Sequence, residues 1–161
     1  MKMTERLIAA INEQINKELY SAYLYRSMSL DTAERALDGV TKWLKLQTRE
    51  EIEHAEAMIA YLEERGVRPE LKPIKEVPNE FGTLEEILTL SLCHEQSITK
   101  SIEEIVKMAI EENDYGARVF FEKFITEQEE EEDTAQHNLD RLALIGDGAV
   151  AIFDQEMGMR E

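Results

Sequence analysis

The sequence predicts an all-α protein, a four-helix bundle with one long connection and a short fifth helix near its C-terminal end. Three observations lead to this fold class. Only 7 glycines and 3 prolines occur among 161 residues, a composition typical of helical proteins. Four long segments repeat apolar residues every third or fourth position. All the prolines fall in one stretch, between the second and third of these segments. We expect a single domain over residues 1–161.

The expected helices follow from this apolar spacing. The first covers about residues 4–35, and the second covers about residues 39–65, after which Gly66 is suited to end a helix. The third begins at Thr83, because Thr83 and Glu86 form the pattern of a capping box. The fourth spans about residues 115–145. The tail at residues 146–158 is expected to form a shorter fifth helix.

The connection between the second and third helices predicts the topology of the bundle. The stretch from Val67 to Gly82 can reach about 50 Å when extended. The second helix is about 40 Å long. The connection can therefore run back along the bundle and leave these two helices parallel, whereas the short connections elsewhere produce antiparallel hairpins.

Composition and charge narrow the classes of partner. The 35 acidic and 18 basic residues give a formal net charge of −17, which repels the phosphates of nucleic acids and attracts cations. No apolar run reaches about 18 residues, so no membrane-spanning helix is predicted. The single cysteine cannot form an internal disulfide, which fits a reducing compartment. We therefore expect a cytoplasmic protein without a nucleic-acid or membrane partner.

Each expected helix interrupts its apolar face with polar residues near its midpoint. In the second helix the apolar face contains Leu44, Ala55 and Met58, and Glu51 falls among them. Midpoints meet at one height in a bundle, whichever way each helix runs, so these residues should form one polar layer. The interrupting residues are Glu18, Glu51, His54, Glu95, Gln128 and Glu131.

A polar layer of this kind indicates a metal site. Two carboxylates 4 Å apart repel by about 4 kcal/mol at an effective dielectric constant of 20. No inward lysine or arginine offsets this repulsion, so the acids either keep protons or surround a multivalent cation. Oxygen donors with one imidazole and no sulfur favour iron or manganese. Glu51 and His54 are three residues apart and can reach one ion, and Glu51 can bridge to a second ion near Glu95. The expected site is dinuclear.

The sequence also resembles the non-haem bacterial and archaeal ferritins over almost its whole length. The matching stretches are NKELYSAYLY, REEIEHAEAM, CHEQSITKSI and ITEQEEEE. The resemblance implies Glu18, Glu51 and His54 as ligands of a first iron. It implies Glu51, Glu95 and Gln128 for a second iron, with Glu131 nearby and Tyr25 beside the pair. It implies a third, looser iron site at Glu50, Glu127 and Glu130, with Glu131 shared. Tyr25 can also be a core aromatic, and the third group of acids can also be a solvated face.

Several positions distinguish the chain from relatives of the non-haem ferritins. Bacterioferritins usually have a second histidine where Glu131 stands and a haem-binding methionine where Ile52 stands, so no haem is expected. Rubrerythrins need a pair of cysteines. Many prokaryotic ferritins carry tryptophan where this chain has Lys123 and Phe124, which removes support for an electron-transfer aromatic there. Two further histidines, His94 and His137, are expected to be structural or surface residues.

The function implied by the resemblance is iron storage with ferroxidase activity. Fe(II) would be oxidised by dioxygen or hydrogen peroxide at the diiron centre, and 24 chains would form a shell that stores the ferric mineral. A diiron or dimanganese protein that consumes peroxide without storing mineral could use the same ligands. A mini-ferritin with metal between subunits fits less well, because the ligand set is complete within one chain. A metal-free interaction bundle leaves the buried acids unexplained.

Overall fold

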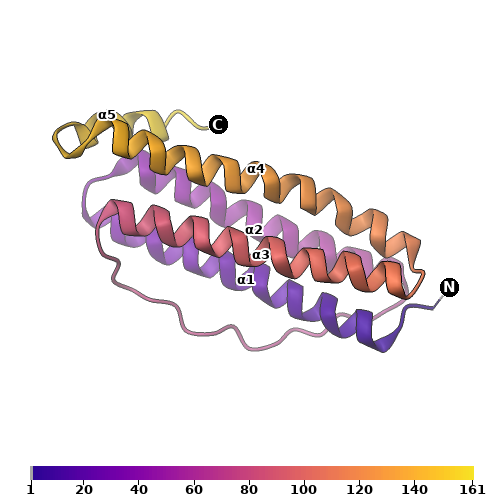
Figure 1. Cartoon of the computed structure of the whole chain (residues 1–161). Coiled ribbons are helices and arrows are strands. Elements are labelled where there is room, and N and C mark those ends of the chain that lie inside the picture. Colours follow the sequence, from indigo (N-terminus) through magenta and orange to yellow (C-terminus); the bar gives the residue numbers. More distant parts are fainter. Residues whose placement is uncertain (1) are drawn as a thin grey trace.

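Four long helices lie side by side and a short fifth helix folds back against one end of them (Figure 1). The structure is a computed structural model and describes residues 2–161, so Met1, the first residue of the expected domain, lies outside the described range. The α-helices are α1 (Glu5–Glu34), α2 (Asp38–Glu64), α3 (Leu84–Glu111), α4 (Tyr115–Ile145) and α5 (Val150–Met157). A 3-10 turn, η1 (Asp147–Ala149), precedes α5. The predicted all-α bundle is confirmed.

The helix ends lie where the local sequence signals place them. The Oγ1 atom of Thr4 accepts a hydrogen bond from the backbone N–H of Leu7, 3.2 Å away, and caps α1. Gly66 follows α2 with a φ angle of +72°, a conformation that favours glycine. Thr83 and Glu86 form the predicted capping box at the start of α3.

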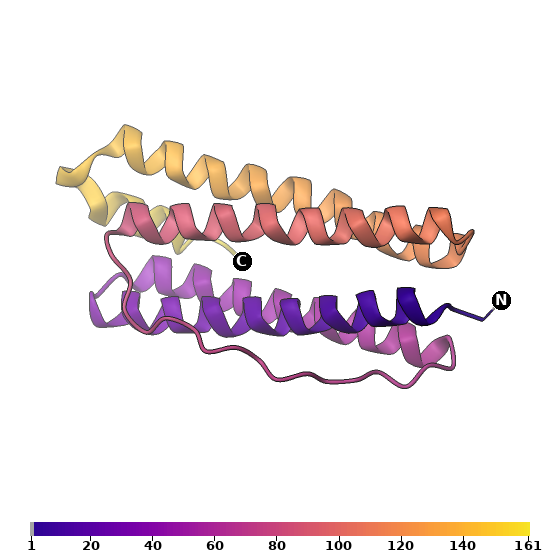
Figure 2. The same ribbon diagram turned by 60° about the horizontal axis from the view of Figure 1, so that its bottom comes forward.

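The long connection runs back along the bundle, so α2 and α3 are parallel (Figures 1 and 2). It lies against α1 and is fixed to it by side chains along that helix. The backbone N–H of Glu70 donates to the Oδ1 atom of Asn12 at 3.0 Å, and the Nδ2 atom of Asn16 donates to the carbonyl of Lys72 at 3.2 Å. Ser27, further along α1, donates to the carbonyl of Pro78.

The buried apolar residues form two clusters, one towards each end of the bundle. All four long helices contribute to each cluster, either with buried residues or with partly buried residues that pack against it. The first cluster includes Leu7, Ile11, Ile15, Ala55, Met58, Leu62, Ile98, Ile102, Phe121 and Phe124. The second includes Leu24, Tyr25, Met28, Val40, Trp43, Leu44, Leu88, Phe153 and Met157. Along α1, α2 and α3, the residues between the two clusters are largely polar, and this boundary is the predicted polar layer.

Helix α5 is docked against the start of α2 through close backbone contact. A Cβ atom at Gly39 would lie 1.7 Å from the carbonyl oxygen of Asp154, so only glycine fits there. The Oδ1 atom of Asp154 accepts from the backbone N–H of Val40 at 2.9 Å. Arg141 on α4 makes two hydrogen bonds to Glu156, of 2.8 and 2.7 Å.

None of the described helices is long and apolar enough to cross a membrane.

Candidate metal centre

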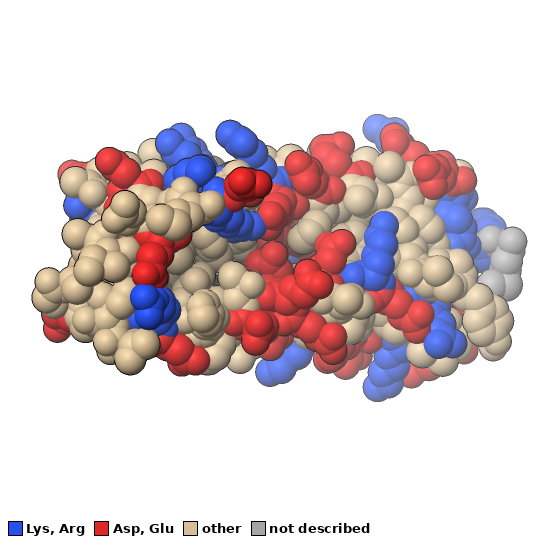
Figure 3. Space-filling view, turned by 90° about the horizontal axis from the view of Figure 1, so that it is seen from above, with Lys and Arg blue, Asp and Glu red and all other residues tan. Residues whose placement is uncertain are grey.

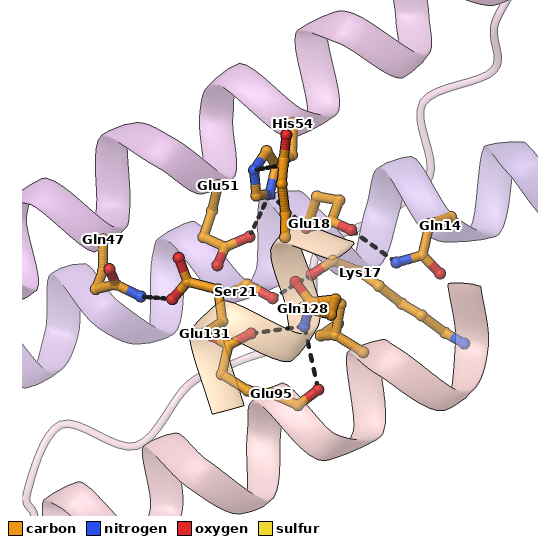
Figure 4. A network of polar contacts seen from close by, with 12 residues as sticks. Gln14, Lys17, Glu18, Ser21, Gln47, Glu51, His54, Glu95, Gln128 and Glu131 are labelled. Atoms are coloured by element: carbon orange, nitrogen blue, oxygen red, sulfur yellow. Dashed lines mark hydrogen bonds and ion pairs between the residues drawn. The ribbon is translucent and has the colours of Figure 1, made fainter. Parts of the chain in front are cut away.

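The polar layer brings carboxylates from all four long helices together at mid-height in the bundle (Figure 4). Four of the predicted ligands are almost fully removed from solvent. Glu18 is 0%, Glu95 1%, Glu51 2% and Gln128 2% exposed. Charged side chains are seldom buried this deeply without a partner, so the partners of each carboxylate determine what the layer can do.

Glu18, Glu51 and His54 form the centre of this layer. One ligand atom from each of the three lies within 4.8 Å of the others, and they are the one such group of three among residues 2–161. The Nδ1 atom of His54 is 3.4 Å from the Oε2 atom of Glu51 and 3.7 Å from the Oε2 atom of Glu18. The three side chains are therefore close enough to share one ion.

Only one of the two oxygens of Glu18 accepts a hydrogen bond, whereas the other has His54 as an ion-pair neighbour at 3.7 Å. Its Oε1 atom accepts a hydrogen bond from the Nε2 atom of Gln14 at 2.7 Å. Its Oε2 atom is buried and finds no hydrogen-bond donor in the described part of the chain. A buried carboxylate oxygen left without a donor costs stability, and a cation would remove that cost.

Glu95 and Gln128 face each other across α3 and α4. The Nε2 atom of Gln128 donates to the Oε2 atom of Glu95 at 2.9 Å. The hydroxyl group of Tyr25 donates to the other oxygen, Oε1, of Glu95. The amide oxygen of Gln128 is the atom of this side chain that could bind a metal. The structure thus places the residues expected around a second ion beside the first group.

The remaining acids lie at the edge of the layer. Glu131 is partly buried and its Oε2 atom accepts from the Nε2 atom of Gln47 at 2.9 Å. The Oε2 atom of Glu127 is 3.1 Å from the Nε2 atom of His54. Glu50 pairs with Arg160 at 2.5 Å, whereas Glu130 lies on the exposed side of α4. The third group of acids is therefore near the centre but not gathered around one point.

The protonation states of the layer follow from its burial and its short distances. Burial raises the pKa of Glu51 well above its usual range, against the lowering effect of His54. In Glu18 burial also acts to raise the pKa, but the proximity of His54 and of Glu51 outweighs it and the pKa is lowered. Burial would lower the pKa of His54, yet Glu18 and Glu51 raise it to about 11. Without metal, these directions favour an imidazolium at His54 and an ionised Glu18, with Glu51 as the carboxyl group of the three that holds a proton most readily.

The same causes act on the second pair. Burial raises the pKa of Glu95 to about 7, although hydrogen bonds from Tyr25 and Gln128 lower it. Burial, followed by the charges of Glu95 and Glu51, raises the pKa of Tyr25 well above its usual range, so Tyr25 stays a neutral phenol. Burial likewise raises the pKa of Glu131. The metal-free layer therefore reduces its own repulsion by keeping protons that a metal ion would displace.

The donor set fits iron. Four carboxylates, an amide oxygen and one imidazole are hard or intermediate ligands, and no sulfur atom lies among them. The unpaired oxygen of Glu18 and the protons held by Glu51 and His54 mark the places that a cation would fill. The sequence predicted that the carboxylates either keep protons or surround a cation. The raised pKa of Glu51 and Glu95 indicates that these residues keep protons when no metal is bound.

Two glutamines that support the ligands are not among the residues predicted from the sequence, although their spacing indicates them. Gln14 precedes Glu18 by four residues and Gln47 precedes Glu51 by four, so each lies on the same helix face as the ligand. Both are 1% exposed. The polar layer is therefore thicker than the six predicted residues indicate, because these glutamines extend it by about one helical turn.

The two histidines expected to be structural or surface residues, His94 and His137, differ in their surroundings. His137 is exposed, and His94 is partly buried with its Nε2 atom 2.6 Å from the Oγ atom of Ser21. Burial lowers the pKa of His94, so the ring is neutral. Lys123 places its Nζ atom 4.1 Å from the centre of the Phe120 ring, a cation–π contact on the surface of α4.

Comparisons with known proteins give one family. The family described as "Ferritin-like domain" matches residues 8–145. A bacterial non-heme ferritin of Bacteroides fragilis is 36% identical over 158 residues, covering 98% of this chain and 99% of that protein. A bacterial non-heme ferritin of Campylobacter jejuni is 37% identical over 151 residues, covering 94% of this chain and 90% of that protein.

Solved structures show the same likeness in three dimensions. An open pore ferritin from the hyperthermophilic archaeon Archaeoglobus fulgidus superposes with a TM-score of 0.97 at 36% identity, covering 99% of each chain. A closed form of that ferritin, engineered by site-directed mutagenesis, gives a TM-score of 0.95 at 37% identity, with 99% of this chain and 98% of that chain covered.

Proposed function

This chain belongs to the ferritin family, and on that premise we propose that it oxidises Fe(II) at an intrachain dinuclear centre and stores the Fe(III) product as a mineral. The observation that carries the proposal is the buried group of Glu18, Glu51 and His54, in which one carboxylate oxygen has no donor. Iron is the substrate and the cargo of this reaction.

The reaction balances with either oxidant. Two Fe(II) ions give one electron each to dioxygen, which takes up two protons and leaves as hydrogen peroxide, with two Fe(III) formed. With hydrogen peroxide as the oxidant, the same two electrons and two protons yield two water molecules. A pair of neighbouring one-electron donors suits a two-electron oxidant, which explains why two positions are needed side by side.

The residues have separate roles in the proposed reaction. Glu18, Glu51 and His54 would bind the first Fe(II), and Glu51, Glu95 and Gln128 the second, with Glu131 beside it. Glu51 would contact both ions. Its proton and that of His54 leave when Fe(II) binds, so iron uptake releases protons. Gln128 supplies a neutral oxygen where a carboxylate would hold Fe(III) more tightly, which favours release of the product.

The phenol of Tyr25 would position Glu95. Its hydroxyl group donates to one carboxylate oxygen of Glu95 while Gln128 donates to the other. Because its pKa is raised, Tyr25 remains a hydrogen-bond donor at neutral pH. Glu50, Glu127 and Glu130, with Glu131 shared, would form a third and looser position through which iron leaves the centre.

Storage requires a closed assembly, and we propose a shell of 24 chains. At 18.6 kDa per chain the shell would have a mass of about 446 kDa. Acidic side chains gather across the middle of the face seen in Figure 3, where they would raise the local concentration of cations. Light scattering that found only monomers or dimers at every salt concentration would contradict storage but not the dinuclear centre.

The decisive experiment compares Glu51→Ala with Glu50→Ala. The first change should abolish rapid oxidation of the first two Fe(II) per chain, because it removes the side chain that would contact both ions. The second should leave that phase unchanged and alter later uptake, because Glu50 lies at the edge of the layer. Stopped-flow absorbance separates the two phases. Oxidation by Glu51→Ala at the wild-type rate would refute the assignment of this centre.

Iron content separates storage from the alternative of a diiron or dimanganese protein that consumes peroxide. After aerobic loading with Fe(II), a storage protein should retain many irons per chain in particles of constant size. A peroxide-consuming protein would retain about two per chain, the number that a dinuclear site holds. Loading with Mn(II) in parallel shows whether the centre turns over a second metal.

A further inference from the structure

The C-terminal segment returns to α2 and places one arginine against the edge of the polar layer. The Nη1 atom of Arg160 donates to the Oε1 atom of Gln47 at 2.5 Å, and its Nη2 atom donates to the Oε1 atom of Glu50 at 2.5 Å. Its guanidinium carbon lies 5.2 Å from the centre of the Trp43 ring. The three partners of Arg160, namely Trp43, Gln47 and Glu50, share one face of α2, because they are spaced by four and then three positions.

Through Gln47 the same arginine also determines how Glu131 is held. The amide oxygen of Gln47 accepts from Arg160, so its Nε2 atom points the other way and donates to the Oε2 atom of Glu131 at 2.9 Å. Figure 4 shows this hydrogen bond from Gln47 to Glu131 beside the central group. Arg160 is therefore tied to two of the four acids of the third position, directly to Glu50 and through one amide to Glu131.

The fold delivers Arg160 to this place. Phe153 and Met157 of α5 are buried in the second apolar cluster at 1% and 6% exposed. The Nζ atom of Lys42 donates to the carbonyl of Gly158 at 3.0 Å, two residues before Arg160. Arg160, Gln47 and Glu131 line a pocket of about 400 Å³ between α2, α4 and α5. The arginine has space beside it, so it can leave Glu50 without unfolding α5.

We propose that Arg160 is the resident counter-cation of the third position and that a metal ion binding there must first displace it from Glu50. The inference rests on the proposed function, since it assumes that Glu50 and Glu131 receive metal after the dinuclear pair. A guanidinium at this point weakens binding twice, because it occupies a carboxylate oxygen and repels the incoming cation. It would therefore keep the third position weak enough for iron to pass on.

The test is a titration of the metal-free shell with Zn(II), which binds carboxylates and imidazole without redox chemistry. Arg160→Gln should bind the third Zn(II) per chain about tenfold more tightly than wild type, a change of about 1.4 kcal/mol, while the first two bind as before. Arg160→Lys keeps the charge but loses the paired hydrogen bonds to Gln47 and Glu50, so its affinity for the third Zn(II) should fall between those of wild type and Arg160→Gln. Isothermal titration calorimetry gives the three affinities.

Tryptophan emission supplies a readout that is independent of affinity. Trp43 is the single tryptophan of the chain and contacts Arg160, so displacement of the arginine should change its fluorescence. In wild type the change should accompany the third Zn(II) and not the first two. In Arg160→Gln no change should accompany the third Zn(II), because no guanidinium lies on the ring.

The matched control is Arg118→Gln, which removes the same charge from an exposed pair with Glu122 on α4. An unchanged third affinity in Arg160→Gln, or an equal rise in Arg118→Gln, would overturn the proposal. So would a Trp43 signal that follows the first two ions. Failure of the proposed function gives a different result, in which wild type binds fewer than two Zn(II) and Glu51→Ala binds as many as wild type.

Discussion

Replacing Glu95 with glutamine tests the electrostatics of the metal-free layer. The pKa of Glu95 is raised from an ordinary value of 4.5 to about 7 by burial. An acid with a raised pKa stabilises the folded state fully below its unfolded pKa, and this stability is lost as pH rises through the folded pKa. At 1.36 kcal/mol per pKa unit the whole effect is about 3 kcal/mol, of which about 2 kcal/mol is lost between pH 5.5 and pH 8.5.

The glutamine variant should lose less stability over this pH range than wild type, by about 2 kcal/mol, because its amide has no proton to give up. Urea unfolding followed by circular dichroism, in chelator and at one protein concentration, gives the free energy of unfolding at each pH. Glu104→Gln, an exposed acid on the same helix, is the control and should follow wild type. Equal pH dependence in wild type and Glu95→Gln would refute the view that Glu95 holds a proton in the metal-free protein.

Two further outcomes follow from the geometry. Zn(II) at about 100 times its dissociation constant should stabilise wild type by about 2.7 kcal/mol per site in anaerobic melting, and Glu51→Ala should gain less. No shift with saturating Zn(II) would mean that the layer is satisfied by its own protons. Gly39→Ala should cost about 1–3 kcal/mol and loosen α5, because its Cβ atom overlaps the carbonyl of Asp154. Gly148→Ala, which meets nothing within 4 Å, is its control in thermal melting, and equal stability of the two variants would contradict the close packing at Gly39.

The bundle could be predicted from the sequence because its information is local. Apolar spacing and end signals such as the Thr83 capping box predict the stated bounds of the four long helices within about one residue, whereas α5 begins four residues later than expected. The polar layer was predictable for the same reason, since Glu18 and Glu51 interrupt otherwise apolar faces at mid-helix. The three apolar residues predicted for the inward face of α2, Leu44, Ala55 and Met58, are all 0% exposed.

The remaining features of the site depend on contacts between residues far apart in the sequence, which the spacing of residues along one helix does not reveal. Arg160 meets Glu50 across 110 positions of sequence, and only the docking of α5 brings them together. Burial acts to lower the pKa of His54, and the imidazolium state depends on Glu18 and Glu51, carboxylates from two different helices, that raise it to about 11. No lysine or arginine in the sequence pattern supplies an inward counter-charge, and His54, an expected ligand, supplies it in the metal-free chain.

The division of the apolar core into two clusters has a mechanical consequence. Phe121 belongs to one cluster and Phe153 to the other, with the polar layer between them. The structural effect of a cavity at one end should therefore not reach the other end by direct side-chain packing. When buried side chains at both ends are truncated together, their losses in the free energy of unfolding should add. Metal ligands drawn from all four helices would couple the two ends. Under the proposed storage function, iron bound at this centre would therefore also stabilise the bundle, which would become less stable once the iron has left.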